Sequence, residues 1–341
     1  MQVFSPAKVN LFLHIKHLRE DEYHEIDSVF AKLDFGDILD FEEKKEGIEI
    51  RASGKYKIPT NADNLVYKAA DIMRARAKGK RGIKIHIEKN IPVGSGLGGG
   101  SSNAATTLKY LNEAWDIHLP QNELMILGES LGADVPFFLS DFSVARVGGV
   151  GEKVIPIKGD IFLQNKLWHK ISPSPSLEKR GVAEYSSLEK RGVAECSSSA
   201  RKVEEKGFPL FKGGVGGISR RDTENDIIIL IIPKYISIGS AWAFVELRKF
   251  YNEKYPQYKS ITNTFEEVIF QKYPDLLTIK QLLIESGAKY ASLSGSGSTV
   301  FGVFEEGGDI EKINKAIGDK GEVIRCKLFV KPECHPSRSS G

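Results

Sequence analysis

A glycine- and serine-rich segment, Pro92 to Ser102, constrains the fold of this chain more than any other. Before it, Ile83, Ile85 and Ile87 alternate with polar residues, which predicts a half-buried strand. After it, apolar residues recur at helical spacing over residues 104–111. Glycines let a backbone adopt positive φ and approach a ligand closely, and a helix start offers free amides and a positive dipole end. The segment therefore predicts a strand–loop–helix unit that binds an anion such as a nucleotide's phosphates.

Two other nucleotide-binding patterns are excluded by the context of this loop. The spacing Gly94-x-Gly96-x-x-Gly99 matches the dinucleotide fingerprint, but that fingerprint follows a hydrophobic parallel strand and needs an acidic residue at the end of the next strand. A Walker A loop ends in Gly-Lys-Ser/Thr, which is absent here. We expect the phosphates of a nucleotide to be bound by Pro92, Val93, Gly94, Ser95, Gly96, Leu97, Gly98, Gly99, Gly100, Ser101 and Ser102, and the family resemblance described below implies that this nucleotide is ATP.

The bulk composition narrows the class of protein. A chain of 341 residues with 41% hydrophobic and 27% charged residues is typical of a globular protein with two domains. A net charge of +3 is too small to predict nucleic-acid binding. The longest apolar run, Ile227–Ile232, is far shorter than the ~20 residues of a membrane helix. With no signal peptide and three scattered cysteines, we expect a cytoplasmic protein that binds neither nucleic acid nor membrane.

Strands and helices are interspersed in both halves, which predicts two α+β domains. The N-terminal domain is expected over residues 1–158 and the C-terminal domain over 225–330, followed by a flexible tail at 331–341. Between them, residues 159–224 contain a duplicated SLEKRGVAE and little apolar surface, which predicts a disordered insertion. The patterns predict strands at 2–15, near 38–41 and 48–50, and at 83–87, 227–232 and 300–304, and helices at 64–76, 104–111, 123–131, 242–255, 265–270 and 278–286.

Three segments resemble, in order, the motifs of the GHMP kinases: SPAKVNLFLHI from Ser5, the glycine loop, and LSGSGSTVFGVF from Leu293. EYHEIDSVF from Glu22 and GADVPFFL from Gly132 resemble the family member that acts on cytidylylated methylerythritol. The resemblance implies an α+β, two-domain GHMP kinase fold. Its N-terminal domain would be like ribosomal S5 domain 2 and its C-terminal domain ferredoxin-like, with the active site in the cleft between them.

The resemblance also implies an activity. The γ-phosphoryl group of ATP would pass to the 2-hydroxyl of the cytidylylated methylerythritol, in the non-mevalonate route to isoprenoids. Mg²⁺ would be carried mainly by ATP, with no dedicated protein site, and the enzyme would be a monomer or homodimer acting on a small molecule. Two alternatives stay open: a GHMP kinase for another alcohol, such as homoserine or mevalonate, and a non-catalytic relative that binds small molecules as a regulator.

Two charged residues are candidates for the chemistry. Asp134 lies just past a helix end marked by Gly132, where a carboxylate is placed to accept a proton, although an aspartate there also commonly caps a helix. Lys8 is the only cation among apolar residues of the first strand, where a lysine also commonly reaches to solvent. The resemblance implies that Asp134 is the general base and that Lys8 keeps it ionised.

Other residues are expected to bind the substrates. Asn10 lies two residues after Lys8, hence on the same strand face. The resemblance implies that Tyr23 stacks on the cytosine and His24 hydrogen-bonds it. It also implies that the turn of Gly295, Ser296, Gly297 and Ser298 closes over the substrate and that Asn64 and Leu65 line the adenine pocket.

The chain departs from the family pattern at two places. Glu22 stands where glycine is common, so the turn before Tyr23 is expected to differ slightly. Thr264 follows Asn263 where an aspartate is usual, and no role is assigned to this segment.

Overall fold

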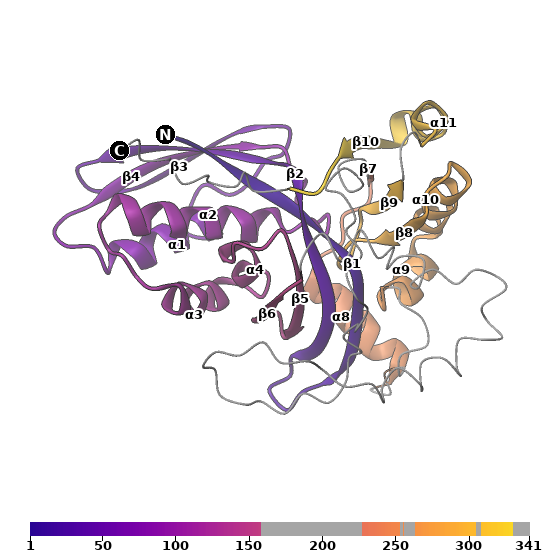
Figure 1. Ribbon diagram of the computed structural model, residues 1–341, viewed down its shortest axis with the longest axis horizontal. Helices are drawn as coiled ribbons and strands as arrows, with labels where there is room; N and C mark the ends of the chain where they lie inside the picture. Colours follow the sequence, from indigo (N-terminus) through magenta and orange to yellow (C-terminus); the bar gives the residue numbers. More distant parts are fainter. Residues whose placement is uncertain (158–226, 253–254, 256–262, 305–307, 330–341) are drawn as a thin grey trace, which may run out of the picture.

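The computed structural model describes residues 1–157, 227–252, 255, 263–304 and 308–329. These residues form two α+β domains joined along a pair of long strands (Figure 1). The predicted insertion at 159–224 and the predicted tail at 331–341 lie outside the described residues.

The N-terminal sheet is built around one very long strand, β2. Its strands are β1 (Gln2–Leu18), β2 (His24–Lys44), β3 (Gly47–Gly54), β4 (Gly82–Lys89), β5 (Val144–Gly149) and β6 (Lys153–Pro156). β1 pairs antiparallel with β2 along almost its whole length. The other edge of β2 is shared, because its second half pairs with β4 and its first half with β5. β2 therefore links two parts of the sheet that would otherwise be separate.

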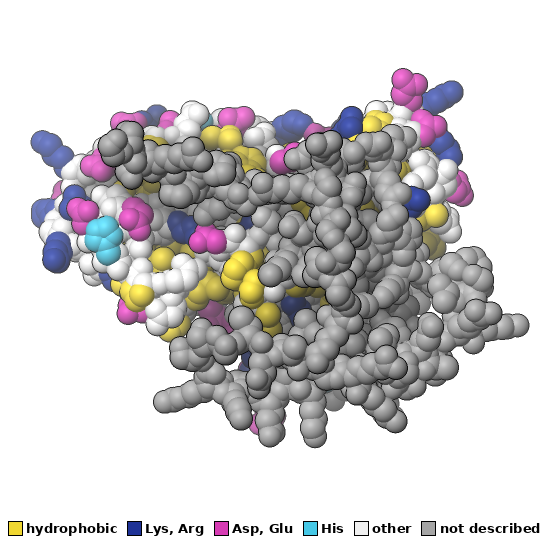
Figure 2. All heavy atoms as spheres, in the orientation of Figure 1, with side chains coloured by type: hydrophobic (Ala, Val, Ile, Leu, Met, Phe, Trp, Pro, Cys, Tyr) yellow, Lys and Arg dark blue, Asp and Glu magenta, His cyan; other side chains and the backbone are white. Residues whose placement is uncertain are grey.

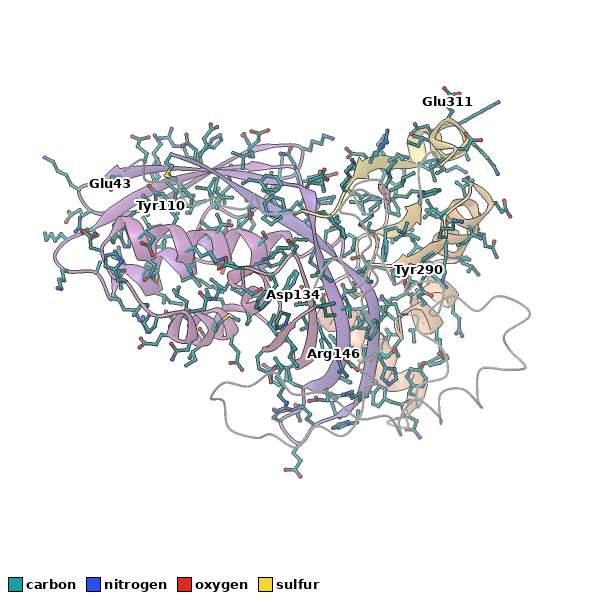
Figure 3. All side chains as sticks on the ribbon, viewed as in Figure 1. Glu43, Tyr110, Asp134, Arg146, Tyr290 and Glu311 are labelled. Carbon is teal, nitrogen blue, oxygen red and sulfur yellow. The ribbon has the colours of Figure 1, made fainter. Side chains whose placement is uncertain are left out.

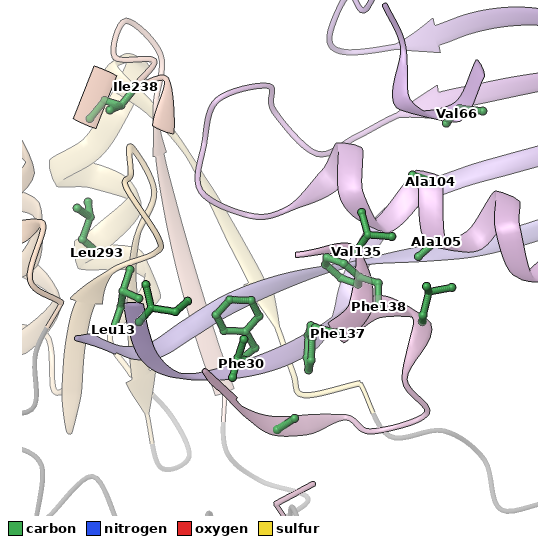
Figure 4. Packing of buried hydrophobic residues seen from close by; sticks show 14 of the residues in the cluster. Leu13, Phe30, Val66, Ala104, Ala105, Val135, Phe137, Phe138, Ile238 and Leu293 are labelled. Carbon is green, nitrogen blue, oxygen red and sulfur yellow. The ribbon is translucent and has the colours of Figure 1, made fainter. Parts of the chain in front are cut away.

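Helices cover one side of this sheet (Figure 1). They are α1 (Leu65–Arg74), α2 (Gly99–Ala114), α3 (Gln121–Leu131) and the short α4 (Val135–Leu139). The predicted strand at 83–87 and helices at 64–76, 104–111 and 123–131 are confirmed within one to five residues at each end. Ala104 and Ala105 of α2 pack near Val135 and Phe138 of α4 in the buried core (Figure 4).

The C-terminal domain is a four-stranded antiparallel sheet in the order β10-β7-β9-β8. Its elements are β7 (Ile227–Pro233), α8 (Ser240–Tyr251), α9 (Glu266–Lys272), α10 (Pro274–Glu285), β8 (Tyr290–Leu293), β9 (Val300–Phe304), α11 (Ile310–Ile317), a 3₁₀ turn η2 (Gly318–Lys320) and β10 (Gly321–Cys326). Strand, helices, two strands, helix and strand follow one another as in the predicted ferredoxin-like fold.

β1 is buried on both faces, whereas its alternating pattern would suggest burial of one face only. The second face is covered because β1 also contacts the C-terminal domain: the Tyr290 hydroxyl donates to the Leu11 carbonyl at 2.7 Å. Leu13 and Leu293 belong to the same buried cluster, on facing elements of the two domains (Figure 4). The polar residues Lys8 and Asn10, which alternate with this apolar row, are also buried, with Phe30, Asp134 and Ser28 of the N-terminal domain as neighbours.

Several elements differ from the sequence-based expectations. Residues 24–36 were not predicted as strand but form the first part of β2, and Tyr290–Leu293, expected as part of a loop, forms β8. The helix expected to reach Tyr255 ends at Tyr251. β2 and β8 carry polar residues that pair with distant buried partners. A local pattern of polarity therefore does not identify these two segments as strands.

Charged side chains of both signs are interspersed over the visible surface of the N-terminal domain (Figure 2). Within the described residues, no helix has the length and apolar character needed to cross a membrane.

Candidate active site

The glycine loop joins β4 to α2 and is held through its backbone carbonyls. Four successive carbonyls of the loop accept hydrogen bonds. The Gly94 carbonyl accepts from Ile238 N at 3.2 Å, and the Ser95 carbonyl accepts from Thr299 N at 3.1 Å. The Gly96 carbonyl accepts from Ser294 Oγ at 3.0 Å, and the Leu97 carbonyl accepts from Lys8 N at 3.0 Å. In a trans peptide the N–H points opposite to the preceding carbonyl. Each amide of residues 95–98 is therefore directed away from the donor that the preceding carbonyl binds. Backbone amides beside a helix N-terminus suit an anion.

Glycine is required in this loop for two separate reasons. Gly94, Gly96 and Gly98 have φ of 66°, 78° and 69°, in the left-handed region that disfavours side chains. A Cβ on Gly96 would also lie 1.9 Å from the carbonyl oxygen of Ser294, in the turn of the C-terminal domain. The two small-residue motifs are thus packed backbone to backbone at Gly96, where a side chain on the loop would not fit.

Lys8 and Asp134, predicted as the catalytic pair, are brought together (Figure 3 labels Asp134). Lys8 Nζ lies 3.4 Å from Asp134 Oδ2, donates to Asn10 Oδ1 at 2.5 Å and lies 4.4 Å from the centre of the Phe30 ring. Asp134 occupies the N-cap position of α4 but its side chain makes no capping hydrogen bond. The helix-capping interpretation is therefore wrong, and the carboxylate is available for other chemistry.

Burial sets the electrostatics of this pair. Lys8 is only 3% exposed, so it does not reach solvent as a strand-edge lysine would. Burial lowers the pKa of the Lys8 ammonium, and the Asp134 carboxylate raises it in opposition. The Asp134 side chain is 30% exposed and so is accessible to a ligand. The arrangement places a reachable carboxylate next to a desolvated cation.

Asn10 connects this pair to the substrate-side turn. Its Nδ2 donates to Ser28 Oγ at 3.1 Å, and a Cβ on Gly295 would lie 3.4 Å from Asn10 Oδ1. The hydroxyls in the turn already have partners: Ser296 Oγ lies 3.1 Å from Ser240 Oγ, and Ser298 Oγ donates to the Ile236 carbonyl. This turn, with Gly297 between the two serines, therefore presents mainly backbone toward Asn10 and the glycine loop.

The two residues expected at the cytosine lie in different environments. Tyr23 is 64% exposed in the turn between β1 and β2, whereas His24 is buried. The His24 ring stacks on Phe244 with a centroid distance of 4.7 Å, and its Nε2 lies 2.7 Å from the Tyr255 hydroxyl. The sequence indicated neither Phe244 nor Tyr255, because they lie in no recognisable motif. Glu22 adopts φ 66°, the conformation that glycine favours, so the turn can also accommodate the common glycine.

The environment of His24 makes a prediction for the pH dependence of stability. Burial, and then the charge of Arg248, lower the pKa of His24 to about 4. Between about pH 6.5, the usual pKa of an unfolded histidine, and about pH 4, the unfolded chain binds a proton at His24 that the folded chain does not bind. The free energy of unfolding therefore falls as the pH falls from about 6.5 toward about 4. The slope from this one residue is at most about 1.4 kcal/mol per pH unit. The free energy of unfolding, measured with urea at pH 7.5 and 5.5, should fall less between these two pH values in His24→Gln than in the wild type.

The matched control is His17 of β1, whose side chain is exposed. His17→Gln should retain the wild-type loss of stability between the two pH values. An equal loss in the wild type and in His24→Gln would show that His24 is not the group responsible.

The expected adenine-pocket residues have clear local roles. Asn64 caps α1, since its Oδ1 accepts from Val66 N at 2.9 Å and its Nδ2 donates to the Pro59 carbonyl at 2.6 Å. Leu65 Cδ1 lies 3.6 Å from the position of a Cβ on Gly100. Leu65 thus lies beside the glycine loop. The polar atoms of Asn64 form the hydrogen bonds that position α1, the helix that begins with Leu65.

Asn263, to which no role was assigned, ties the site together. It is fully buried, and its Nδ2 donates to the carbonyls of Leu293 (2.8 Å) and Gly295 (2.6 Å) at the start of the substrate-side turn. Next to it, Thr264 bonds to β1: its N donates to the Leu13 carbonyl at 2.8 Å, and its Oγ1 accepts from Ile15 N at 3.1 Å. The segment links β1 to the turn. The signal in the sequence was that Thr264 stands where an aspartate is usual. The role of this segment became clear only from the hydrogen-bond partners of Asn263 and Thr264 in the structure.

Comparison with known proteins gives this geometry a family. The GHMP kinases N terminal domain matches residues 64–141, and the GHMP kinases C terminal domain matches residues 243–323. The 4-diphosphocytidyl-2-C-methyl-D-erythritol kinase of Alkaliphilus metalliredigens (strain QYMF) is 33% identical over 90% of this chain and 89% of its own length. The chain belongs to this family of GHMP kinases.

Further relatives agree with this membership. The kinase of the same name from Syntrophus aciditrophicus (strain SB) is 31% identical over 94% of this chain and 96% of its own length. A crystal structure of 4-(cytidine 5'-diphospho)-2C-methyl-D-erythritol kinase superposes with a TM-score of 0.64 at 24% identity, over 97% of this chain and all of that one. The Methanococcus jannaschii mevalonate kinase superposes with a TM-score of 0.58 at 15% identity, over 97% of this chain and 98% of its own. The two structures show the shared two-domain GHMP kinase fold.

Proposed function

We propose that this GHMP kinase transfers the γ-phosphoryl group of ATP to the 2-hydroxyl of 4-diphosphocytidyl-2-C-methyl-D-erythritol. The observation that carries the proposal is the contact between Asp134 and Lys8 beside the glycine loop. A kinase needs a phosphate cradle, a group that takes the proton of the acceptor hydroxyl, and positive charge near the transferred group. The names of the most similar relatives supply the acceptor alcohol.

The proposed reaction divides these tasks among the chain's own residues. The loop amides bind the triphosphate, and Asp134 accepts the proton of the 2-hydroxyl as the new O–P bond forms and the bond to the ADP oxygen breaks. Lys8 keeps the Asp134 carboxylate ionised, and Asn10 orients Lys8. The products are the 2-phosphate, ADP and a proton.

Mg²⁺ would neutralise charge on the triphosphate when bound with ATP. Among the described residues, no group of three or more His, Cys, Asp or Glu side chains is placed to hold a metal ion. We therefore expect the ion to be carried mainly by the phosphate oxygens of ATP.

The cytidine end of the substrate would lie near Tyr23 and His24. An exposed tyrosine ring beside the His24–Phe244 stack offers the flat apolar surfaces on which a base stacks. Because His24 Nε2 is already 2.7 Å from the Tyr255 hydroxyl, a hydrogen bond to cytosine must use Nδ1 or displace that hydroxyl. This aromatic cluster favours a nucleotide-bearing alcohol over a small one.

A coupled assay of ADP release tests the acceptor. The cytidylylated alcohol, mevalonate and homoserine are supplied separately with the same Mg·ATP, and ³¹P NMR identifies any new phosphomonoester. We expect turnover with the cytidylylated alcohol alone. Turnover with mevalonate or homoserine instead would identify a different GHMP kinase. ATP binding without turnover of any of the three would favour the non-catalytic regulator.

A further inference from the structure

A buried carboxylate, Asp37, lies beneath the glycine loop and is used by nothing described so far. It is fully buried in β2, and Lys89, the last residue of β4, is 3% exposed. Lys89 Nζ donates to Asp37 Oδ2 at 2.5 Å. This ion pair joins β2 to its neighbour β4, the strand that leads into the loop.

The remaining contacts of Asp37 go to both ends of the loop. Its Oδ1 accepts from the backbone amides of Asn90 (2.7 Å) and Ile91 (2.8 Å), the two residues just before Pro92. Its Oδ2 also accepts from Asn103 Nδ2 at 2.9 Å, just after the loop in the first turns of α2. One carboxylate thus holds the start and the end of the loop in a single geometry.

Lys89 sets how closely α2 approaches this cluster. A Cβ on Gly99, the first residue of α2, would lie 2.8 Å from Lys89 Nζ. The ammonium group is therefore packed directly against the backbone at the helix start, where the phosphates are expected. Moving either partner of the ion pair must move that helix start.

A role in geometry explains this pair better than a role in stability alone. A buried ion pair often stabilises a fold no more than apolar residues of the same volume, while the loss of one partner is strongly unfavourable. Asn103 also supports a role in geometry, because its Oδ1 is buried and has no hydrogen-bond partner among the described residues. The Nδ2 of the same side chain donates to Asp37, at the base of the loop.

We propose that Asp37 and Lys89 are positioning residues for the nucleotide: they fix both ends of the glycine loop so that its amides converge on the ATP phosphates, without contacting ATP. The inference rests on the proposed function only in taking this loop as the ATP site. It follows that damage to the pair weakens nucleotide binding and leaves the binding of the acceptor alcohol unchanged.

The test compares Asp37→Asn, Lys89→Met and the double variant in the full chain. ATP dissociation constants are measured by calorimetry without any alcohol, and KM is measured for each substrate. We expect each single variant to weaken ATP binding about tenfold or more, because each leaves a buried charge unpaired, with the KM of the alcohol within about twofold.

The double variant should recover most of the ATP affinity, to within about threefold of the wild type. It removes both charges of the pair, and the amide oxygen introduced by Asp37→Asn can still accept from the backbone amides of Asn90 and Ile91. The amide nitrogen introduced by the same substitution can donate to Asn103 Oδ1 once the Asn103 amide rotates by half a turn, which brings Oδ1 to the place that Nδ2 occupies in the wild type. In the wild type this oxygen has no hydrogen-bond partner among the described residues. Recovery of this kind would not follow from a merely additive loss of stability.

The matched control is the pair Glu42 and Lys84, which joins the same two strands at 2.5 Å on the protein surface. Glu42→Gln and Lys84→Met should leave the ATP dissociation constant within about twofold. If the two single variants fail to fold, Lys89→Arg takes their place, because its larger head group displaces the helix start while keeping the charge. Lys89→Arg should then weaken ATP binding and leave the KM of the alcohol unchanged.

Unchanged ATP affinity in the folded variants at Asp37 and Lys89 would overturn the proposal. So would a parallel rise in the KM of the alcohol, since that would indicate general damage to the fold. Failure of the proposed function is separable: a wild type that binds ATP without phosphorylating the cytidylylated alcohol refutes that function and leaves this inference standing.

Discussion

Replacing Asp134 by Asn is expected to lower kcat by about 10²- to 10⁴-fold, the usual contribution of a positioned general base. The amide keeps the size of the side chain but cannot take the hydroxyl proton. Since Asp134 makes no capping hydrogen bond to α4, the helix start should be little affected. Steady-state kinetics with the cytidylylated alcohol measure kcat, and calorimetry with ATP alone shows whether the nucleotide site is intact.

Asp134→Asn has an additional consequence at Lys8. The carboxylate opposes the lowering of the Lys8 pKa by burial, so its removal should lower that pKa further. Asn10 Oδ1 and the Phe30 ring then remain near the ammonium group. Turnover in this variant should stay low at every pH at which the protein is folded, because the amide introduced at position 134 cannot accept the hydroxyl proton.

Asp141→Asn is the matched control, because Asp141 lies just past the other end of α4 with a side chain that is 70% exposed. Its kcat should stay within about twofold of the wild type. Undiminished turnover in Asp134→Asn would contradict the assignment of the base.

Replacing Gly96 by Ala is expected to separate the glycine loop from the C-terminal domain and to abolish measurable ATP binding. The new Cβ would lie 1.9 Å from the carbonyl oxygen of Ser294 and 3.1 Å from that of Gly297, both backbone atoms that cannot turn aside. Overpacking of this kind costs about 1–3 kcal/mol or more, and the φ of 78° adds about 1–2 kcal/mol. Thermal unfolding and ATP calorimetry measure the two effects.

Gly47→Ala separates the contact from the backbone strain. Gly47 has φ 84°, similar to that of Gly96, but a Cβ there would meet nothing within 4 Å. This control should lose only the strain, about 1–2 kcal/mol, and keep ATP binding. If Gly96→Ala behaved like Gly47→Ala, the close packing of the loop on Ser294 would not matter for the nucleotide.

Motifs in the sequence singled out the residues of the candidate site, but they did not single out the residues that hold them in place. Lys8, Asp134 and the glycine loop each lie in a recognisable segment, and the structure brings them together. Asp37 was missed because it lies in a stretch that gave no local signal. Its partners Lys89 and Asn103 are 52 and 66 residues away, and nothing in a local pattern connects them.

Burial was similarly out of reach of the sequence. Lys8 and Asn10 alternate with apolar residues in β1, which predicts an exposed polar face. The structure buries them because Lys8 packs against Phe30 and Asp134 of its own domain, and Asn10 lies between Ser28 and the position of Gly295. The C-terminal sheet covers the apolar row instead, at Val9 and Leu11. A pattern of alternation shows that a strand has two kinds of faces, but it does not show what packs against the polar one.

The glycine loop illustrates the same division. The sequence by itself determined a strand, a loop with left-handed glycines and a helix, because periodicity and the preference of glycine for positive φ are local properties. Only the tertiary structure decided which way the loop faces. Its carbonyls are held by Lys8 of β1 and by Ile238, Ser294 and Thr299 of the C-terminal domain, and these bonds between distant residues fix the direction of the loop's peptide groups.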